Sequence, residues 1–266
     1  MPAIYAHRRF GEETAKGLNP TLQAVVTKYP EAFTLGTQGP DVLFYHKPLK
    51  RNETRLHGTN THAKSGKAVF DNMHALWVEQ GKKEDAFLAY LCGYLCHFTL
   101  DALCHKYIDE HSTSAVSHGK IESEFDKFML RKDGFSIRSQ NTAKFISGKN
   151  GCKQACALAM GVDEKKIARS IKTMRKINGM FSSRVELFHS FAHFVLRIAK
   201  MERKFGDMFL HKKDDPLCVQ TNLDLIEKWQ NAIPVAIGIV EAFFGADNPT
   251  QNELFRYDFS GIIKEN

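Results

Sequence analysis

One long apolar segment, residues 84–109, constrains the fold more than any other part of the chain. Three titratable side chains interrupt it at steps of four: His97, Asp101 and His105. In a helix, residues four apart share a face, so these side chains form one stripe. Their neighbours are apolar: Leu95, Cys96, Phe98, Leu100, Leu103 and Cys104. An ionised carboxylate there costs several kcal/mol unless it is paired or bound to metal. The segment therefore predicts a buried helix that carries a polar site.

The spacing of the three side chains limits what kind of metal site they could form. Eight residues of helix rise ~12 Å along the axis. One ion held at ~2.0–2.2 Å from each ligand cannot easily collect both histidines and the carboxylate. The order His–Asp–His suits two or more ions, with Asp101 between them, because a carboxylate has two oxygens and can bridge.

Helical periodicity recurs along most of the chain, and no segment shows the alternation of a convincing strand. Helices are predicted at residues 61–79, 84–109, 121–130, 184–209 and 217–244, and one capped by Asp163 that carries Ile167, Ile171, Met174 and Ile177. Polar or Gly/Pro-rich loops are predicted at residues 35–48, 110–119 and 131–142. No shift in composition divides the chain, so we expect a single all-α domain over residues 1–266. Its metal site would be built from about residues 3–126, and the C-terminal helices would complete the bundle.

Further candidate ligands lie on either side of the central segment. His118 and Glu122 are again four apart, at the expected start of the next helix, where His105 could join them around one ion. The upstream candidates are Asp41 on a Gly-Pro-Asp turn, His62 at the start of the 61–79 helix, and His7 beside the N-terminus.

Each candidate also has a plain structural interpretation. A lone histidine is more often a core or surface residue than a ligand, a His-x3-Asp pair is also the spacing of a helix salt bridge, and Asp41 could simply favour its turn. The apolar surroundings of Asp101, and two His-x3-acid pairs within 26 residues, favour the metal interpretation. His189 and His193 form a similar pair on a Phe-rich helix, but no carboxylate partner is evident, and we expect them to pack.

Composition adds weaker expectations about location and partners. The net charge is +7 with pI ≈ 9.0, which could favour an anionic substrate, but the basic pairs are scattered and suit a solvated surface equally well. The six cysteines contain no CxxC pair, so we expect free buried thiols. The start of the sequence lacks the apolar segment of a secretory signal and no uncharged apolar run of ~18 residues occurs, so we expect a cytoplasmic protein.

The order "H…GPD…H…HFTLDALCH…HGKIE" over roughly residues 3–126 resembles the zinc-dependent phospholipase C family. That superfamily also includes fungal zinc nucleases and the catalytic domain of glycosylphosphatidylinositol-specific phospholipase D, and the three-residue gap between Asp101 and His105 looks more like the phospholipase D branch. The resemblance implies an all-α fold with up to three zinc ions in a cleft. It implies one ion held by Asp41, His62, His97 and Asp101, a second by His105, His118 and Glu122, and a third by His7 and the bridging Asp101.

In secreted relatives the mature N-terminal residue also binds the third ion. Here Pro2 follows Met1, and removal of Met1 would let Pro2 supply that terminus, which we state as a hypothesis.

The function that this resemblance implies is zinc-dependent hydrolysis of a phosphodiester by a metal-activated water, with two to three zinc ions. Asp41 could act as the general base, and Phe44 and Tyr45 could border the substrate. A phospholipid head group is the favoured substrate, with peripheral contact to a membrane and a monomeric chain. Single-stranded nucleic acid is an alternative substrate of the same superfamily, and a non-enzymatic zinc-binding protein is a second alternative.

Overall fold

The protein is built from helices in every part of the chain that the computed structural model describes, which is residues 4–137, 141–183, 185–198, 206–245 and 248–264. Within these ranges there is no β-strand; the β-type pairing there is an isolated antiparallel bridge between Tyr257 and Ile263. In chain order the elements are α1 (Ile4–Gly17), α2 (Pro20–Lys28), α3 (Pro30–Gly36), the 3-10 helix η1 (Gly39–Tyr45), α4 (Glu53–His62), α5 (Gly66–Glu79), α6 (Ala86–His111), α7 (His118–Lys132), α8 (Cys152–Met160), α9 (Glu164–Phe181), α10 (Glu186–Ile198), η2 (Gly206–Met208), η3 (Pro216–Cys218), α12 (Val219–Gly245) and η4 (Glu253–Arg256). The all-α expectation is confirmed.

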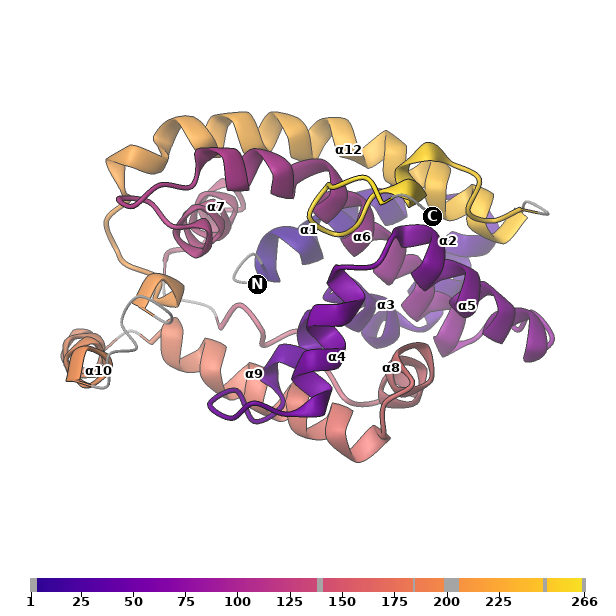
Figure 1. Ribbon diagram of the computed structural model, residues 1–266, viewed down its shortest axis with the longest axis horizontal. Helices are drawn as coiled ribbons and strands as arrows, with labels where there is room; N and C mark the ends of the chain where they lie inside the picture. The colour runs from indigo at the N-terminus through magenta and orange to yellow at the C-terminus, as the bar shows by residue number, and fades with distance from the viewer. Residues whose placement is uncertain (1–3, 138–140, 184, 199–205, 246–247, 265–266) are drawn as a thin grey trace.

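Helix α6 is the axis around which the other helices pack (Figure 1). It begins at Asp85, whose side chain accepts hydrogen bonds from the backbone N–H groups of Phe87 and Leu88, and it runs for 26 residues, about 39 Å. Helices α1, α2, α3, α5, α7, α8 and α12 and the 3-10 helix η1 all contact it. Because neighbours cover nearly every side of it, most of its residues are apolar, and the stripe of His97, Asp101 and His105 faces other helices.

By length and composition alone, α6 could also cross a membrane. Its most apolar window of 18 residues has a mean hydropathy of 1.4, but 94% of that window is buried inside the protein. The packing of the core therefore accounts for its apolar composition.

Two glycines let α3 and α6 touch backbone to backbone. A Cβ atom on Gly93 would lie 2.1 Å from the carbonyl oxygen of Phe33, and one on Gly36 would lie 2.1 Å from that of Tyr90. The short chain after α3 therefore passes directly over the middle of α6. This contact brings the carbonyl of Thr37 within 3.2 Å of Nδ1 of His97.

The helix predicted at residues 61–79 is wrong at its N-terminal end. Helix α4 ends at His62, and a separate helix, α5, begins at Gly66. The break is made by Ser65, which has extended backbone angles and whose side chain accepts from the N–H of Ala68 as an N-cap. His62 therefore lies at the C-terminal end of one helix and not at the start of the next.

Other local predictions agree with the structure. Asp163 caps α9 through the N–H groups of Lys165 and Lys166, and α7 begins at His118. All six cysteines are free and buried. The predicted loop at 35–48 contains η1, which holds Asp41 in its first turn. Of the helix predicted at 184–209, the structure describes α10 over Glu186–Ile198 and the 3-10 helix η2 over Gly206–Met208, and residues 184 and 199–205 lie outside the described ranges.

Candidate metal centre

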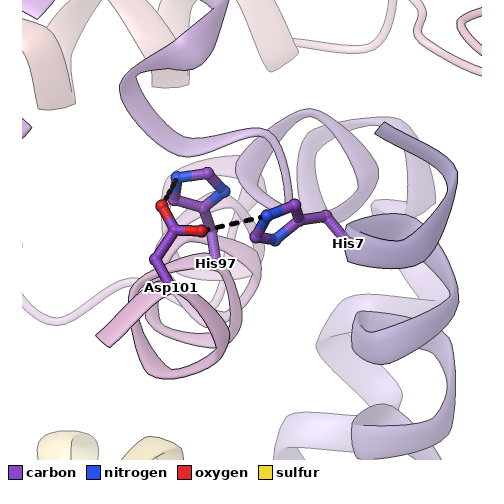
Figure 2. Close-up of side chains that lie close together, drawn as sticks. All are labelled: His7, His97 and Asp101. Carbon is purple, nitrogen blue, oxygen red and sulfur yellow. Dashed lines mark ion pairs between the residues drawn. The ribbon is translucent and has the colours of Figure 1, made fainter. Parts of the chain in front are cut away.

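Asp101 lies at the middle of a buried cluster of histidines (Figure 2). Its Oδ2 is 3.0 Å from Nε2 of His97, one turn before it on α6, and its Oδ1 is 3.3 Å from Nε2 of His105, one turn after it. Helix α1 adds His7, whose Nε2 is 3.1 Å from the same Oδ1. The carboxylate thus faces three imidazole nitrogens from two helices, and only 2% of the residue is exposed.

A second group forms where α6 and α7 meet. Oε1 of Glu122 is 3.3 Å from Nε2 of His105 and 3.5 Å from Nε2 of His118. Glu122 is buried, whereas the side chain of His118 is 36% exposed to solvent. Of the ligand candidates in these ion pairs, His118 is the most exposed, so the cluster meets the surface at this end.

A third group involves η1 and the end of α4. Oδ1 of Asp41 lies 2.9 Å from Nε2 of His62. Gly39 opens η1 with φ at +48°, and a Cβ there would lie 2.2 Å from the ring of His97. Only glycine allows both that backbone angle and that approach, so η1 can lie against His97 and bring Asp41 to the cluster.

All eight predicted ligands therefore come together, in three groups whose ligand atoms lie within 4.8 Å of one another. The groups are His7 with His97 and Asp101, Asp41 with His62 and His97, and His105 with His118 and Glu122. Two of these groups share His97, and Asp101 lies between His97 and His105 on α6, as the helical spacing predicted. The role of each residue as a metal ligand stays a prediction.

Hydrogen bonds at Nδ1 hold four of the rings in the orientation that a metal ligand would need. Nδ1 of His62, His97 and His105 each lies against a backbone carbonyl, of Gly58, Thr37 and Phe259, at 2.7–3.2 Å. Nδ1 of His118 lies 2.7 Å from a carboxylate oxygen of Asp109. Such an acceptor fixes the proton on Nδ1 and leaves the lone pair of Nε2 for a metal. In all four residues, Nε2 is the atom that points into the cluster.

Several buried polar atoms of the cluster make no hydrogen bond, which also fits a metal site. Nδ1 of His7, Nε2 of His97 and Oδ2 of Asp101 are buried and make no hydrogen bond, although the last two lie only 3.0 Å apart. Buried polar atoms are rarely left without a partner. The close approach of His97 Nε2 and Asp101 Oδ2 is the arrangement that ligands of a shared ion would have.

The charges in the cluster are strongly coupled. Burial alone would lower the pKa of the imidazoles, but Asp101 and then Glu122 raise the pKa of His105 to about 9. The pKa of His62 and of His118 is also raised, by the nearby carboxylates acting against burial. Burial would raise the pKa of Asp101 and Glu122, yet the surrounding positive charges hold both well below the usual range. The two carboxylates are therefore ionised, and the raised pKa values of His62, His105 and His118 favour protons on these three rings.

Zinc binding is expected to depend steeply on pH. Because the pKa of His105 is raised, the chelator-treated protein carries a proton there at pH 7 that zinc must displace. Apparent affinity should fall about tenfold per pH unit, for each proton released, as pH drops from 8 to 6. Competition titration with a chromophoric chelator at three pH values measures this, and a flat profile would contradict it.

Sequence reasoning missed Asp126, which holds the N-terminal turn of α1 in place. This α7 residue is 1% exposed, and its two oxygens accept from the backbone N–H groups of Tyr5, at 3.1 Å, and Ala6, at 2.8 Å. It therefore acts as a helix cap supplied from another helix, next to His7. Burial raises its pKa to about 8, although the two N–H groups favour the ionised form. Its place four residues after Glu122 is the one signal in the sequence that could have drawn attention to it.

Asp126→Ala should weaken both the fold and the metal site. It leaves two buried N–H groups without acceptors, so we expect a loss of about 2–3 kcal/mol in unfolding free energy. It should also lower zinc affinity about 10–100-fold by releasing the helix that carries His7. Asp163→Ala is the matched control, because it removes a cap at the surface of α9 and should cost about 1 kcal/mol without changing zinc affinity. Equal zinc affinity in the two variants would refute the positioning role of Asp126.

The two predicted substrate-contacting residues differ in placement. Phe44 is half-buried, and its ring lies 5.2 Å from that of His62. Tyr45 is 2% exposed, and its hydroxyl accepts a hydrogen bond from Asn178 in the core. Phe44 therefore borders the cluster and Tyr45 supports it from inside, while substrate contact stays a prediction for both. Pro2, the hypothetical additional ligand, lies outside the described residues.

The fold and the cluster together define a class of protein, an all-α protein whose core helices gather histidines and carboxylates into groups that could hold metal ions. A sequence model of the zinc-dependent phospholipase C family matches residues 6–177, more than half of the 266 residues, and the chain belongs to this family. The match includes all eight predicted ligands and extends well beyond the region of the predicted resemblance. The family and the chemistry of the cluster both fit zinc. No curated protein and no solved structure matches the chain.

Proposed function

We propose that this protein is a zinc-dependent phosphodiesterase that hydrolyses the head-group phosphodiester of a phospholipid. The observation that carries the proposal is the position of Asp101, whose two oxygens face His7 and His105 on one side and His97 on the other. A carboxylate in this place can be shared by neighbouring ions, which is the arrangement that phosphodiester hydrolysis by several metals needs.

The residues divide into sites for two to three zinc ions. His105, His118 and Glu122 would hold one, and Asp41, His62 and His97 another, with Asp101 next to both. His7 and Asp101 would hold a third. Bound zinc supplies Lewis acidity that polarises the phosphate and acidifies the attacking water.

Asp41 is the residue we propose to orient and deprotonate the water. It is buried at the edge of the cluster, and although burial acts to raise its pKa, the hydrogen bond and charge of His62 help to hold it below the usual value. It is therefore ionised at neutral pH and can accept a hydrogen bond from water. The substrate would approach at the His118 end, where the cluster meets the surface.

The test combines metal analysis with three substrates. Zinc per chain is measured after purification, and hydrolysis of a generic phosphodiester, of phosphatidylcholine micelles and of single-stranded DNA is measured with and without a chelator. We expect at least two zinc ions per chain, micelle hydrolysis above DNA hydrolysis, and recovery when zinc is added back. Faster cleavage of DNA would favour the nuclease. Bound zinc without hydrolysis would favour a non-enzymatic zinc protein, and fewer than two ions would count against the site.

A further inference from the structure

A tight turn near the C-terminus, residues 257–263, returns the chain to the metal cluster. It follows the 3-10 helix η4, and Tyr257 and Ile263 form the isolated bridge at its base. Figure 1 draws this part of the chain in yellow, beside α6 and the junction of α4 and α5. The turn lies outside residues 6–177, the range that the family model matches. Its contacts with the cluster are therefore a feature that the family match does not assign.

The buried side chain of Asp258 gives the turn its shape. Oδ1 of Asp258 accepts hydrogen bonds from the backbone N–H groups of Ser260, at 2.9 Å, and Ile262, at 3.0 Å. Oδ2 pairs with Nζ of Lys264 at 2.8 Å. A carboxylate that binds N–H groups two and four residues ahead holds the backbone in one conformation. The turn is thus internally fixed.

Gly261 places the turn directly on α6. Its φ is +71°, a backbone angle that favours glycine, and a Cβ there would lie 2.7 Å from the carbonyl oxygen of Ala102. Ala102 immediately follows Asp101, the central carboxylate of the cluster. The absence of a side chain at Gly261 therefore lets the turn rest on the part of α6 that carries the metal site.

Phe259 connects ligands of two different groups through its backbone. Its N–H donates to the carbonyl of His62, the last residue of α4, at 3.3 Å, and its carbonyl accepts from Nδ1 of His105 at 2.7 Å. His62 belongs to the ligand group of Asp41, and His105 belongs to that of Glu122. The backbone of one residue thus spans two of the three candidate ion sites.

The ring of Phe259 fixes these two hydrogen bonds in place. The residue is fully buried, and its ring lies 5.2 Å from the ring of His62 and 6.0 Å from that of His97. Phe98, on α6, packs against it at 5.0 Å. Because a close-packed side chain has little room to shift, the backbone of Phe259 keeps a constant position relative to both histidines.

Anchoring of the chain to the core does not require these contacts. The carbonyl of Tyr257 accepts from the N–H of Gly66, and Leu254 and Phe255 are buried, which already fastens this part of the chain. The two bonds of Phe259 go instead to residues that carry candidate metal ligands. A partner on the outer nitrogen of a metal-binding imidazole orients the ring, and its loss typically costs 10–100-fold in metal affinity.

We propose that Phe259 is a positioning residue of the metal centre, and that its backbone N–H and carbonyl set the placement of the His62 and His105 ion sites relative to each other. The 257–263 turn is then part of the metal centre, and zinc binding at both sites depends on it. This inference rests on the metal centre of the proposed function but not on its reaction, so metal binding tests it separately from hydrolysis.

The experiment compares two glycine-to-alanine variants of the full chain. Gly261→Ala should push the turn away from α6, because the new Cβ meets a backbone carbonyl. Gly81→Ala is the matched control: its φ of +77° gives similar backbone strain, a Cβ there meets nothing within 4 Å, and the preceding helix α5 carries none of the eight predicted ligands. Zinc affinity is measured for each ion by competition with a chromophoric chelator. The visible absorption bands of the cobalt(II)-loaded protein report ligand geometry, and the thermal midpoint and hydrolysis of a soluble phosphodiester are measured in parallel.

We expect Gly261→Ala to weaken zinc binding about 10–100-fold at two ions together and to shift the cobalt bands. Gly81→Ala should lower the thermal midpoint by a few degrees through strain, with zinc affinity and cobalt bands as in the unaltered chain. Phe259→Leu keeps both backbone groups, so its zinc affinity should stay within about threefold although its thermal midpoint falls. If Gly261→Ala does not fold, Asp258→Ala takes its place, because it frees the turn without adding a contact, and the same loss of zinc is expected.

Zinc affinity and cobalt bands that match those of Gly81→Ala overturn the inference and leave the proposed function intact. A loss confined to one ion overturns the link between the two sites, and an equal loss in Phe259→Leu assigns the effect to the ring and overturns the backbone role. Weakened zinc binding in Gly261→Ala, in a protein whose unaltered zinc-loaded form hydrolyses no phosphodiester, supports the inference and overturns the proposed function.

Discussion

Asp101→Asn should release at least one zinc ion per chain and lower phosphodiester hydrolysis by at least about 1,000-fold. The neutral amide keeps the size of the side chain but cannot bridge two cations through charged oxygens, and loss of several kcal/mol of charge stabilisation corresponds to a rate loss of that order. Zinc is measured by atomic absorption after dialysis, and hydrolysis with a soluble phosphodiester. The variant should also lower the pKa of His105 in chelator-treated protein, because Asp101 is the main charge that raises it.

Asp109→Asn provides the graded control on the same helix. Asp109 contacts Nδ1 of His118 from outside the cluster, so its loss should reduce zinc affinity or activity about 10–100-fold. Asp101→Asn should therefore be the more damaging change. Full zinc occupancy in Asp101→Asn would sink the bridging role of this carboxylate.

Gly93→Ala should lower the thermal midpoint by about 5–10 °C, even though alanine is the better helix former. The new Cβ would lie 2.1 Å from the carbonyl oxygen of Phe33 and 2.8 Å from the N–H nitrogen of Thr37, and backbone atoms cannot rotate away. Overpacking of this kind costs up to about 3 kcal/mol, well above the gain in helix propensity of about 1 kcal/mol. Zinc affinity should fall as well, because the carbonyl that orients His97 belongs to Thr37.

Gly238→Ala is the matched control, with the same substitution inside another helix. Gly238 lies within α12, and a Cβ there would meet nothing within 4 Å. The one remaining effect is the higher helix propensity of alanine, so the thermal midpoint should rise by a few degrees with zinc affinity unchanged. If Gly93→Ala and Gly238→Ala both raised the thermal midpoint, or both lowered it, the close approach of α3 to α6 would be disproved.

Local sequence patterns were informative where the physics is local. The four-residue steps of His97, Asp101 and His105 specify one helical stripe wherever the helix lies, and the predicted cap at Asp163 depends only on the next few residues. The same reasoning failed at residues 61–79, where one helix was predicted. The N-cap at Ser65 separates two helices there, and the apolar periodicity does not reveal the break. The sequence patterns also predicted no helix at α1, α2, α3, α4 or α8 and assigned η1 to a loop; all of these except α1 have ten residues or fewer.

The sequence by itself determined the all-α class, the central helix and the five candidate ligands that stand four residues apart, because apolar periodicity and i, i+4 spacing are properties of neighbouring residues. The family resemblance joined His7, Asp41 and His62 to them. Only the tertiary structure decided how the ligands group, since His7, Asp41 and His62 are brought to α6 by backbone contacts at Gly39 and Gly93 and by the cap from Asp126. It also decided which ring nitrogens face the cluster, because carbonyls of Thr37 and Phe259, far along the chain, hold the opposite nitrogens. Such contacts join residues that are far apart in the sequence, and a periodic pattern of neighbouring residues cannot predict them.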